Sequence, residues 1–465
     1  MPRPATVLAL PSALAGRLSP AELADLHAYA DPDAVLVPDP VYAPGRFRPP
    51  GSDVPILTPE GEVHVLGDVT LAVCETLDHV RAVTSGAAFG EADDSGHTAF
   101  LASTLLSVET DPMALDTRLD GAAAYREALG DDDGEQRSPT VHLAGYVPAD
   151  YRREWDGLDV QGVAPVETQG APAVPVLALH PDGTVAVDEV RTDRLALRAL
   201  SGVGDSRAAA LSQAGYDRET LAETPPHELA DLDGFGRSSA ETAVRSARAL
   251  ERGELLRTGD APLPADPVFL DIETDGLRPS VVWQVGVQYR DDYRSFLARD
   301  PDDAPAMLGG FLDWLSGVDG TLVAWNGWGF DFPVLDEHVE AHHPERRDVW
   351  RRASKCDLLQ WARDEGNAVL PGRTNKLEAV AGALGYEGHG TGLTGAETAR
   401  RYRAWMDGGP EPDWERHRNY CEDDVRMLAH VYDAIAATDR VESTVADRAA
   451  TNQEGDTRQG SLSEF

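Results

Sequence analysis

The chain has 465 residues and a formal net charge of −39, because 80 Asp and Glu stand against 41 Lys and Arg. A hydrophobic content of 42% excludes an intrinsically disordered acidic protein, and the length predicts about two to four folded domains. The acidic residues are spread over the whole chain, which indicates a protein adapted to very high salt. Near 1 M salt the Debye length is only about 3 Å, so this acidity does not exclude nucleic acid as a partner.

The three cysteines, Cys74, Cys356 and Cys421, lie far apart and form no Cys-x-x-Cys pair. This spacing argues against a disulfide framework and against structural zinc, and it fits a reducing compartment. No apolar run approaches the roughly 18 residues of a membrane span, and the first residues lack the pattern of a signal peptide. We therefore expect a soluble, cytoplasmic protein.

Residues 1 to 194 alternate apolar, strand-like runs with helical patterns, which predicts a separate α/β domain. Ser19 and Glu22 have the spacing of a capping box, so we expect a helix to begin after Ser19. A Pro-Asp-Gly turn at 181–183 predicts a hairpin. No motif in this region indicates a function. The predicted strands cover residues 6–10, 34–37, 63–66, 70–74, 176–179 and 184–187.

Residues 195 to 258 contain one short pattern twice, a Gly-apolar-Gly turn followed by a helical stretch, with the copies 32 residues apart. Helices are predicted through Ala214 and over 238–250. Each copy resembles the helix-hairpin-helix motif, whose glycines allow a tight turn and leave amide groups free for a phosphate. The resemblance implies non-specific nucleic-acid binding, and packing as an inter-domain linker is the alternative. The glycines are Gly202, Gly204, Gly234 and Gly236.

Residues 259 to 267 contain three prolines and have the composition of a linker. They lead into a predicted buried strand over 268–274, which carries Asp271 and Glu273. Residues two apart on a strand point to the same side, and paired carboxylates suit a hard cation such as Mg²⁺. A chain with 80 acidic residues contains many such pairs by chance. This pair therefore indicates a metal site only if other parts of the chain supply further ligands.

Predicted elements further along the chain supply candidates for such ligands. Strands are predicted over 283–289 and 293–297 and a helix over 304–315. An apolar strand over 321–325 then runs into Asn326 and reaches Asp331 at the start of a helix. A long amphipathic helix over 414–436 carries Tyr420 and Asp424, which share a face because they are four residues apart.

Three motifs in this order resemble those of the DEDD-type 3′→5′ exonucleases of the ribonuclease-H-like superfamily. They are Asp-x-Glu at 271–273, Asn-Gly-x-x-Phe-Asp at 326–331 and Tyr-x-x-x-Asp at 420–424. Tyr420 and the neighbouring Asn419, which stands where another subtype has His, match the tyrosine subtype. The resemblance covers residues 268–436 and implies a mixed sheet with flanking helices. With the hairpins and the acidity, it indicates a halophilic archaeal protein.

The resemblance also implies roles for single residues. Asp271, Glu273, Asp331 and Asp424 would hold two divalent cations, Mg²⁺ or Mn²⁺, and Tyr420 would orient the attacking water. Asn326 would help to shape the site, and Trp328 or Phe330 would stack on a frayed terminal base, whereas Trp283 and Trp325 are expected in the core. The alternative is a nuclease fold that binds nucleic acid but no longer cleaves it.

The segment from residue 346 to residue 426 carries as many Arg and Lys as Asp and Glu, so it is relatively basic in this acidic chain. Its arginines are candidates for phosphate contacts, although solvated helix faces would look the same. They are Arg346, Arg347, Arg351, Arg352, Arg400, Arg401 and Arg403.

Residues 437–465 are poor in apolar side chains, which predicts a disordered tail. Its end, with Gln459, Leu462 and Phe465, resembles the motif by which replication proteins bind the sliding clamp. This end has one aromatic residue where the fuller motif has two. The alternative to clamp binding is that the resemblance arose by chance.

Together, these patterns predict a metal-dependent 3′→5′ exonuclease of single-stranded or frayed nucleic acid, with DNA in replication or repair preferred. An RNA-processing exonuclease and a non-catalytic nucleic-acid-binding protein of a repair complex are the two alternatives.

Overall fold

The computed structural model describes residues 3–39, 44–85, 98–111, 116–130, 141–168 and 171–440. The chain divides into two compact units, one of Met1–Ala196 with Gly392–Glu397 and the other of Leu197–Thr391 with Thr398–Phe465. Within the described ranges, no helix combines the length and the apolar character that crossing a bilayer requires.

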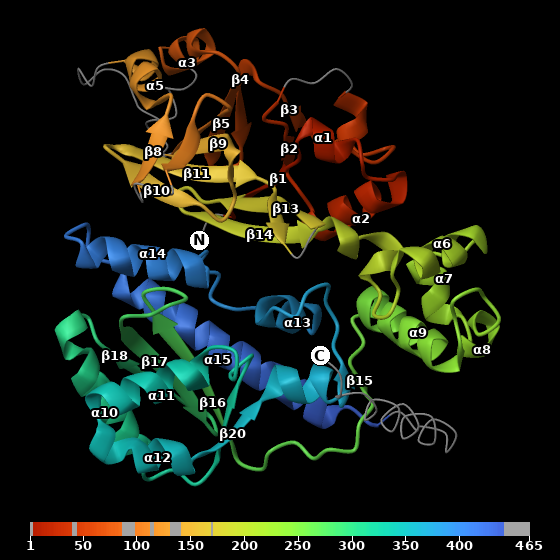
Figure 1. The fold of residues 1–465 in the computed structure, drawn as a ribbon, viewed down its shortest axis with the longest axis vertical. Coiled ribbons are helices and arrows are strands. Elements are labelled where there is room, and N and C mark those ends of the chain that lie inside the picture. The colour runs from red at the N-terminus through yellow and green to blue at the C-terminus, as the bar shows by residue number, and fades with distance from the viewer. Residues whose placement is uncertain are drawn as a thin grey trace, which may run out of the picture. The chain divides into compact units, whose positions relative to one another are not determined.

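The N-terminal unit contains two six-stranded sheets (Figure 1). The strands and the hairpin predicted in this region are confirmed, but none of the strands between residues 98 and 168 was predicted. One sheet consists, in order, of β12 (Val166–Thr168), β13 (Ala171–Leu179), β1 (Ala5–Ala9), β2 (Ala34–Leu36) and β3 (Ile56–Leu57), with β14 (Val185–Arg191) also on β13. The other consists of β10 (Arg152–Trp155), β11 (Leu158–Ala164), β9 (Val141–Pro148), β6 (Thr98–Ser103), β5 (Val69–Cys74) and β4 (Glu60–Leu66).

Alternating side chains explain how these two sheets pack. Val7 of β1 and Phe100 of β6 belong to one core that the sheets share, whereas their sequence neighbours Leu8 and Leu101 belong to cores on the outer faces. The outer cores are completed by helices, and the predicted capping box of Ser19 and Glu22 opens α2. On the first sheet these helices are α1 (Ser12–Ala15) and α2 (Pro20–Ala30), and on the second they are α3 (Leu77–Thr84) and α5 (Ala122–Leu129). Strands β7 (Ser107–Asp111) and β8 (Asp116–Asp120) form a separate two-stranded sheet.

Residues 197 to 252 form a helical region with a small apolar core of its own. Both predicted helices are confirmed, as α6 (Asp205–Gln213) and α9 (Arg237–Arg252), and α7 (Arg218–Glu223) and α8 (Pro226–Leu229) lie between them. The turns before α6 and α9 contain Gly202 and Gly234 with φ of +74° and +78°. Only glycine adopts this conformation without strain, which accounts for its recurrence in both copies of the pattern.

The C-terminal half is built on a five-stranded mixed sheet. All its predicted strands are confirmed, and β20 was not predicted. The order is β18 (Asp292–Leu297), β17 (Val282–Tyr289), β16 (Pro267–Thr274), β19 (Thr321–Ala324) and β20 (Ser354–Asp357). The first three strands pair antiparallel and the last three pair parallel, so β16 is the central strand. Outside it, β15 (Leu256–Arg257) pairs with β21 (Ala368–Val369).

Helices cover both faces of this sheet (Figure 1). Val268, Leu270 and Ile272 of β16 enter a core with α10 (Ala304–Leu315), α11 (Asp331–His342) and α12 (Arg347–Arg352). Phe269 points the other way, into a core with α13 (Leu377–Ala383) and α15 (Trp414–Ala437). Because side chains alternate along a strand, Asp271 and Glu273 share the face of Phe269 and meet α15. The remaining helix is α14 (Gly395–Met406).

Candidate active site

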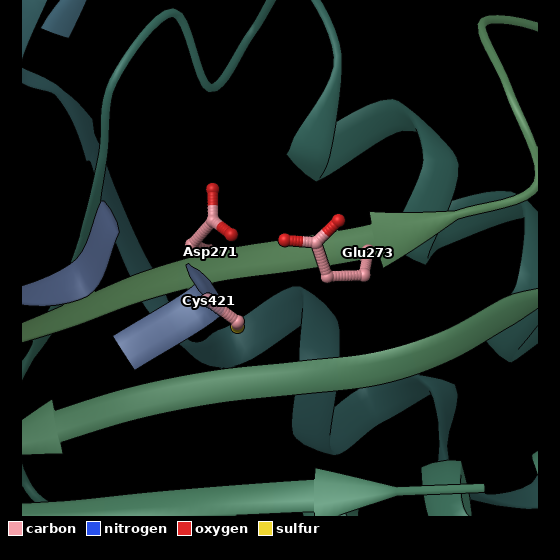
Figure 2. Close-up of side chains that lie close together, drawn as sticks. All are labelled: Asp271, Glu273 and Cys421. Atoms are coloured by element: carbon pink, nitrogen blue, oxygen red, sulfur yellow. The ribbon is translucent and has the colours of Figure 1, made fainter. Parts of the chain in front are cut away.

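The last residues of β16 present two carboxylates to α15. Asp271 is half-buried and Glu273 is only 5% exposed. One oxygen of each lies within 4.8 Å of the other and of the sulfur of Cys421, which reaches the strand from α15 (Figure 2). The predicted pairing of Asp271 and Glu273 on one side of a strand is therefore what the structure shows.

Helix α15 brings Tyr420 and Asp424 to the same place. The hydroxyl of the buried Tyr420 donates a hydrogen bond to the carboxylate of Asp424, one helical turn away. The negative charge of Asp424 raises the pKa of both Asp271 and Glu273. The two motifs therefore meet in space, although about 150 residues separate them in the sequence.

Asp331 opens α11 and completes the group of four carboxylates. It is 6% exposed, and its carboxylate accepts hydrogen bonds from its own backbone amide and from that of Ile272 in β16. Its position depends on the tight loop that follows β19, where Asn326 has a φ of +56°. A Cβ at Gly327 would lie 2.7 Å from the ring of Phe332, and a Cβ at Gly329 would lie 2.6 Å from the amide of Asn326. A side chain at position 327 would therefore clash with the packed ring of Phe332, and one at position 329 would displace the side chain of Asn326.

The aromatic residues of this loop behave differently from each other. Trp328 is 51% exposed and packs edge-on against Phe332, with 4.8 Å between ring centroids. Phe330 packs against the core instead. Of the two predicted stacking residues, Trp328 is thus the one that is open to a ligand. Trp283 is fully buried and stacks on Tyr402, in agreement with its prediction as a core residue.

The closeness of four carboxylates, two of them buried and two half-buried, shifts their pKa values. Desolvation, joined by repulsion from the neighbouring carboxylates, holds the pKa of Asp271, Glu273 and Asp424 well above the usual range. Desolvation also raises the pKa of Asp331 to about 7. Without compensating charge, the group therefore retains protons at neutral pH.

The donor set fits divalent cations. Within the described part of the chain, Asp271 Oδ2 and Glu273 Oε1 are buried without a hydrogen-bond partner. Buried polar atoms are normally paired, and carboxylate oxygens are the ligands that Mg²⁺ and Mn²⁺ prefer. A cation would satisfy both atoms and offset the repulsion among the carboxylates.

Two acidic residues near this cluster were missed from the sequence. Asp357, at the end of β20, is 6% exposed and accepts hydrogen bonds from the backbone amides of Trp328 at 3.1 Å and Gln360 at 3.1 Å. The negative charge of Glu378 in α13 raises the pKa of both Asp424 and Tyr420. Asp357 ends β20, whose sequence Ser-Lys-Cys-Asp has no apolar pattern, so no signal in the sequence indicated that it lies beside β19.

Other predicted residues lie apart from the cluster. The arginines of α12 and the preceding turn form ion pairs with carboxylates near them, such as Arg346 with Asp313 and Arg347 with Glu340, which favours the solvated-surface alternative. Arg403 lies beside Gly276, in the loop that follows Glu273. The glycines Gly202, Gly204, Gly234 and Gly236 belong to the separate helical region. Gln459, Leu462 and Phe465 lie outside the described residues, so the clamp motif stays a prediction.

The sheet order, the flanking helices and the carboxylates at the end of the central strand define a ribonuclease-H-like domain. A family model described as "RNase_H superfamily" matches residues 268–436, the same bounds that the sequence predicts. Comparison with curated protein sequences gave no match.

Comparison with solved structures gave matches of low identity and low TM-score. The family B DNA polymerase from Pyrobaculum calidifontis has 17% identity and a TM-score of 0.30, over 58% of this chain and 44% of that chain. Exonuclease I of E. coli with a dT13 oligonucleotide has 18% identity and a TM-score of 0.22, over 33% of this chain and 42% of that chain. In both, this chain spans less than half of the other protein.

The raised pKa values predict a pH-dependent stability for the metal-free protein. The unfolded chain releases the proton of Asp331 near pH 3.8, whereas the folded chain keeps it to about pH 7, so the folded state holds more protons between these values. The free energy of unfolding should therefore fall as the pH rises through this window, at about 1.4 kcal/mol for each unit of pKa shift. Thermal unfolding in molar salt at pH 5 and pH 8 measures this fall.

Mn²⁺ should raise the melting temperature more at pH 8 than at pH 5, because it binds the ionised carboxylates. The substitution Asp331→Asn should reduce both the pH dependence and the Mn²⁺ effect, whereas Asp336→Asn, on the exposed side of α11, should change neither. Equal behaviour of the two variants would contradict the assignment of the raised pKa to Asp331.

Proposed function

We propose that this protein is a metal-dependent 3′→5′ exonuclease that hydrolyses phosphodiester bonds at the end of a single-stranded or frayed nucleic acid, preferably DNA in replication or repair. The observation that carries the proposal is the convergence of four carboxylates and Tyr420 in a ribonuclease-H-like domain. No covalent nucleophile is required in this reaction, because water attacks the phosphorus.

The chain's own residues account for the main needs of the reaction. Asp271, Glu273, Asp331 and Asp424 would hold two divalent cations, which when bound activate water and stabilise the leaving 3′ oxygen. The hydroxyl of Tyr420, fixed by its hydrogen bond to Asp424, orients the attacking water. The exposed ring of Trp328 stacks on the terminal base, with Asn326 shaping the turn that carries it.

Loss of the central carboxylates tests the proposal directly. Asp271→Ala and Asp424→Ala should each reduce Mn²⁺-dependent hydrolysis by about 10³-fold or more, since each removes a ligand that contributes several kcal/mol to the transition state. The matched control is Asp433→Asn, an exposed acidic residue of the same helix α15, which should retain full activity. The assay digests end-labelled DNA and RNA in molar salt, with and without Mn²⁺.

The position of the label reports polarity and substrate. A 5′-labelled strand should shorten stepwise from its 3′ end, and a 3′-phosphate should protect it. Preference for RNA would favour the RNA-processing alternative, and binding without cleavage by the unmutated protein would favour the non-catalytic one. Full activity in both alanine variants would overturn the catalytic assignment.

Asp357 should act through the loop that it holds. Its carboxylate anchors the amide of Trp328 to the end of β20, so Asp357→Ala frees the turn between Asn326 and Asp331. We expect kcat/KM on single-stranded DNA to fall by about 10- to 100-fold, the usual effect of removing a group that positions the reacting residues. Asp348→Ala, an exposed residue of α12, is the control. An unchanged kcat/KM in Asp357→Ala would contradict this role.

The helical region supports a second element of the proposal, non-specific binding of the nucleic-acid backbone. Arg207 donates hydrogen bonds to Gly234 O at 2.7 Å and to Gly202 O at 2.5 Å, so one guanidinium ties the two glycine turns together. The turns precede α6 and α9, and amide groups at helix N-termini suit phosphate oxygens. Asp205, in the first turn of α6, opposes such binding locally.

Alanine at these turns should weaken binding and folding together. Gly202→Ala and Gly234→Ala each force a side chain into the left-handed region, which costs about 1 kcal/mol. We expect lower affinity for DNA of any sequence, measured by fluorescence anisotropy at a fixed salt concentration. Gly215→Ala serves as the control, because Gly215 also has a positive φ, of +85°, but follows α6 instead of preceding it. Equal affinity in all three variants would contradict the backbone-binding role.

A further inference from the structure

The thiol of Cys421 is buried between α15 and the sheet, beside the carboxylates of β16. It is fully buried in α15, next to Tyr420, and it is a free cysteine. Its sulfur lies within 4.8 Å of one carboxylate oxygen of Asp271 and one of Glu273 (Figure 2). Both residues lie near the end of the central strand, and Glu273 Oε1 is buried without a hydrogen-bond partner among the described residues.

The sheet makes room for this sulfur. Gly286 in β17 lies opposite Asp271, and a Cβ added to it would lie 2.5 Å from Cys421 Sγ. The same added atom would lie 3.2 Å from the hydroxyl of Tyr293. Any other residue at position 286 would therefore clash with the thiol where it lies, and glycine leaves the space that the sulfur occupies.

In the cation-free protein the thiol keeps its proton. Burial, together with the charges of Asp271, Glu273 and Asp424, holds the pKa of Cys421 well above its ordinary value. A buried, protonated thiol is inert as a nucleophile, so a role in covalent chemistry is excluded. Coordination is different, because a bound cation displaces the proton of a ligating thiol, which passes to solvent.

We infer that Cys421, Asp271 and Glu273 form a binding site for a thiophilic divalent cation such as Zn²⁺, in competition with the Mg²⁺ or Mn²⁺ of the proposed nuclease site. Zinc bonds to sulfur at about 2.3 Å and to carboxylate oxygen at about 2.0–2.2 Å, so donor atoms within 4.8 Å of one another need only small side-chain rotations to share one ion.

The mixed donor set determines which ions prefer this site. Thiolate sulfur favours zinc and softer ions, whereas Mg²⁺ and Mn²⁺ favour oxygen. A thiophilic ion held by Cys421 would occupy Asp271 and Glu273, which the nuclease reaction needs. Zn²⁺ should therefore inhibit hydrolysis by competition, and this consequence rests on the proposed function. The coordination itself does not.

Cadmium provides a spectroscopic test that is independent of activity. Titration of the full chain with Cd²⁺ should produce the ultraviolet sulfur-to-cadmium charge-transfer band, saturating at one equivalent. The band should be absent in Cys421→Ser and in Cys421→Ala, and weakened in Glu273→Gln. It should persist in Cys356→Ser, the control cysteine in β20. Circular dichroism and thermal unfolding check that each variant is folded.

Inhibition supplies the second measurement. With each variant's own Mn²⁺-dependent rate as the reference, the Zn²⁺ concentration for half-inhibition should rise about tenfold or more in Cys421→Ser and stay unchanged in Cys356→Ser. A missing band in the unmutated protein, or a band that persists in folded Cys421→Ser, overturns the inference even if DNA is hydrolysed. A band that depends on Cys421 without any hydrolysis keeps the cation site and overturns the proposed function.

Discussion

Repulsion among buried carboxylates is the constraint on which the rest of the C-terminal domain depends. Asp271, Glu273, Asp331 and Asp424 are held together by elements that pack for other reasons, since the apolar side chains of β16 and α15 fill the cores on the two faces of the sheet. The burial of apolar area fixes those elements, and the fixed elements keep the charges close. Protons or cations must then offset the charge, which links cation binding to the stability of the fold.

The sequence predicts the parts of this arrangement that local periodicity controls. Strand β16, helix α10 and helix α15 follow from short apolar patterns, and the capping box at Ser19 locates the start of α2. The family model that matches residues 268–436 supports the ribonuclease-H-like fold that the three motifs imply. The roles of the individual site residues remain a proposal, now supported by their closeness in space.

What the sequence does not predict are contacts made across long stretches of chain. Strand β1 pairs with β13 far along the chain, so the sheets of the N-terminal unit could not be derived from local patterns. Asp357 reaches Trp328 only because β20 lies beside β19, and Cys421 approaches Asp271 only because Gly286 leaves space. Neither residue belongs to a sequence motif, so each became a candidate only when the fold showed which residue it contacts.

The central position of β16 also affects how readily this part of the domain opens to solvent. Amide groups in the middle of a sheet that is covered on both faces exchange with solvent only when the whole domain opens, whereas terminal elements fray at little cost. Val268 and Phe269, which pair with strands on both sides, should therefore exchange most slowly, whereas Asp271 and Glu273 follow where β16 pairs with β17 alone. Trp328 projects from a loop into solvent. The acidic ligands thus stand between the most protected part of the sheet and an exposed aromatic residue.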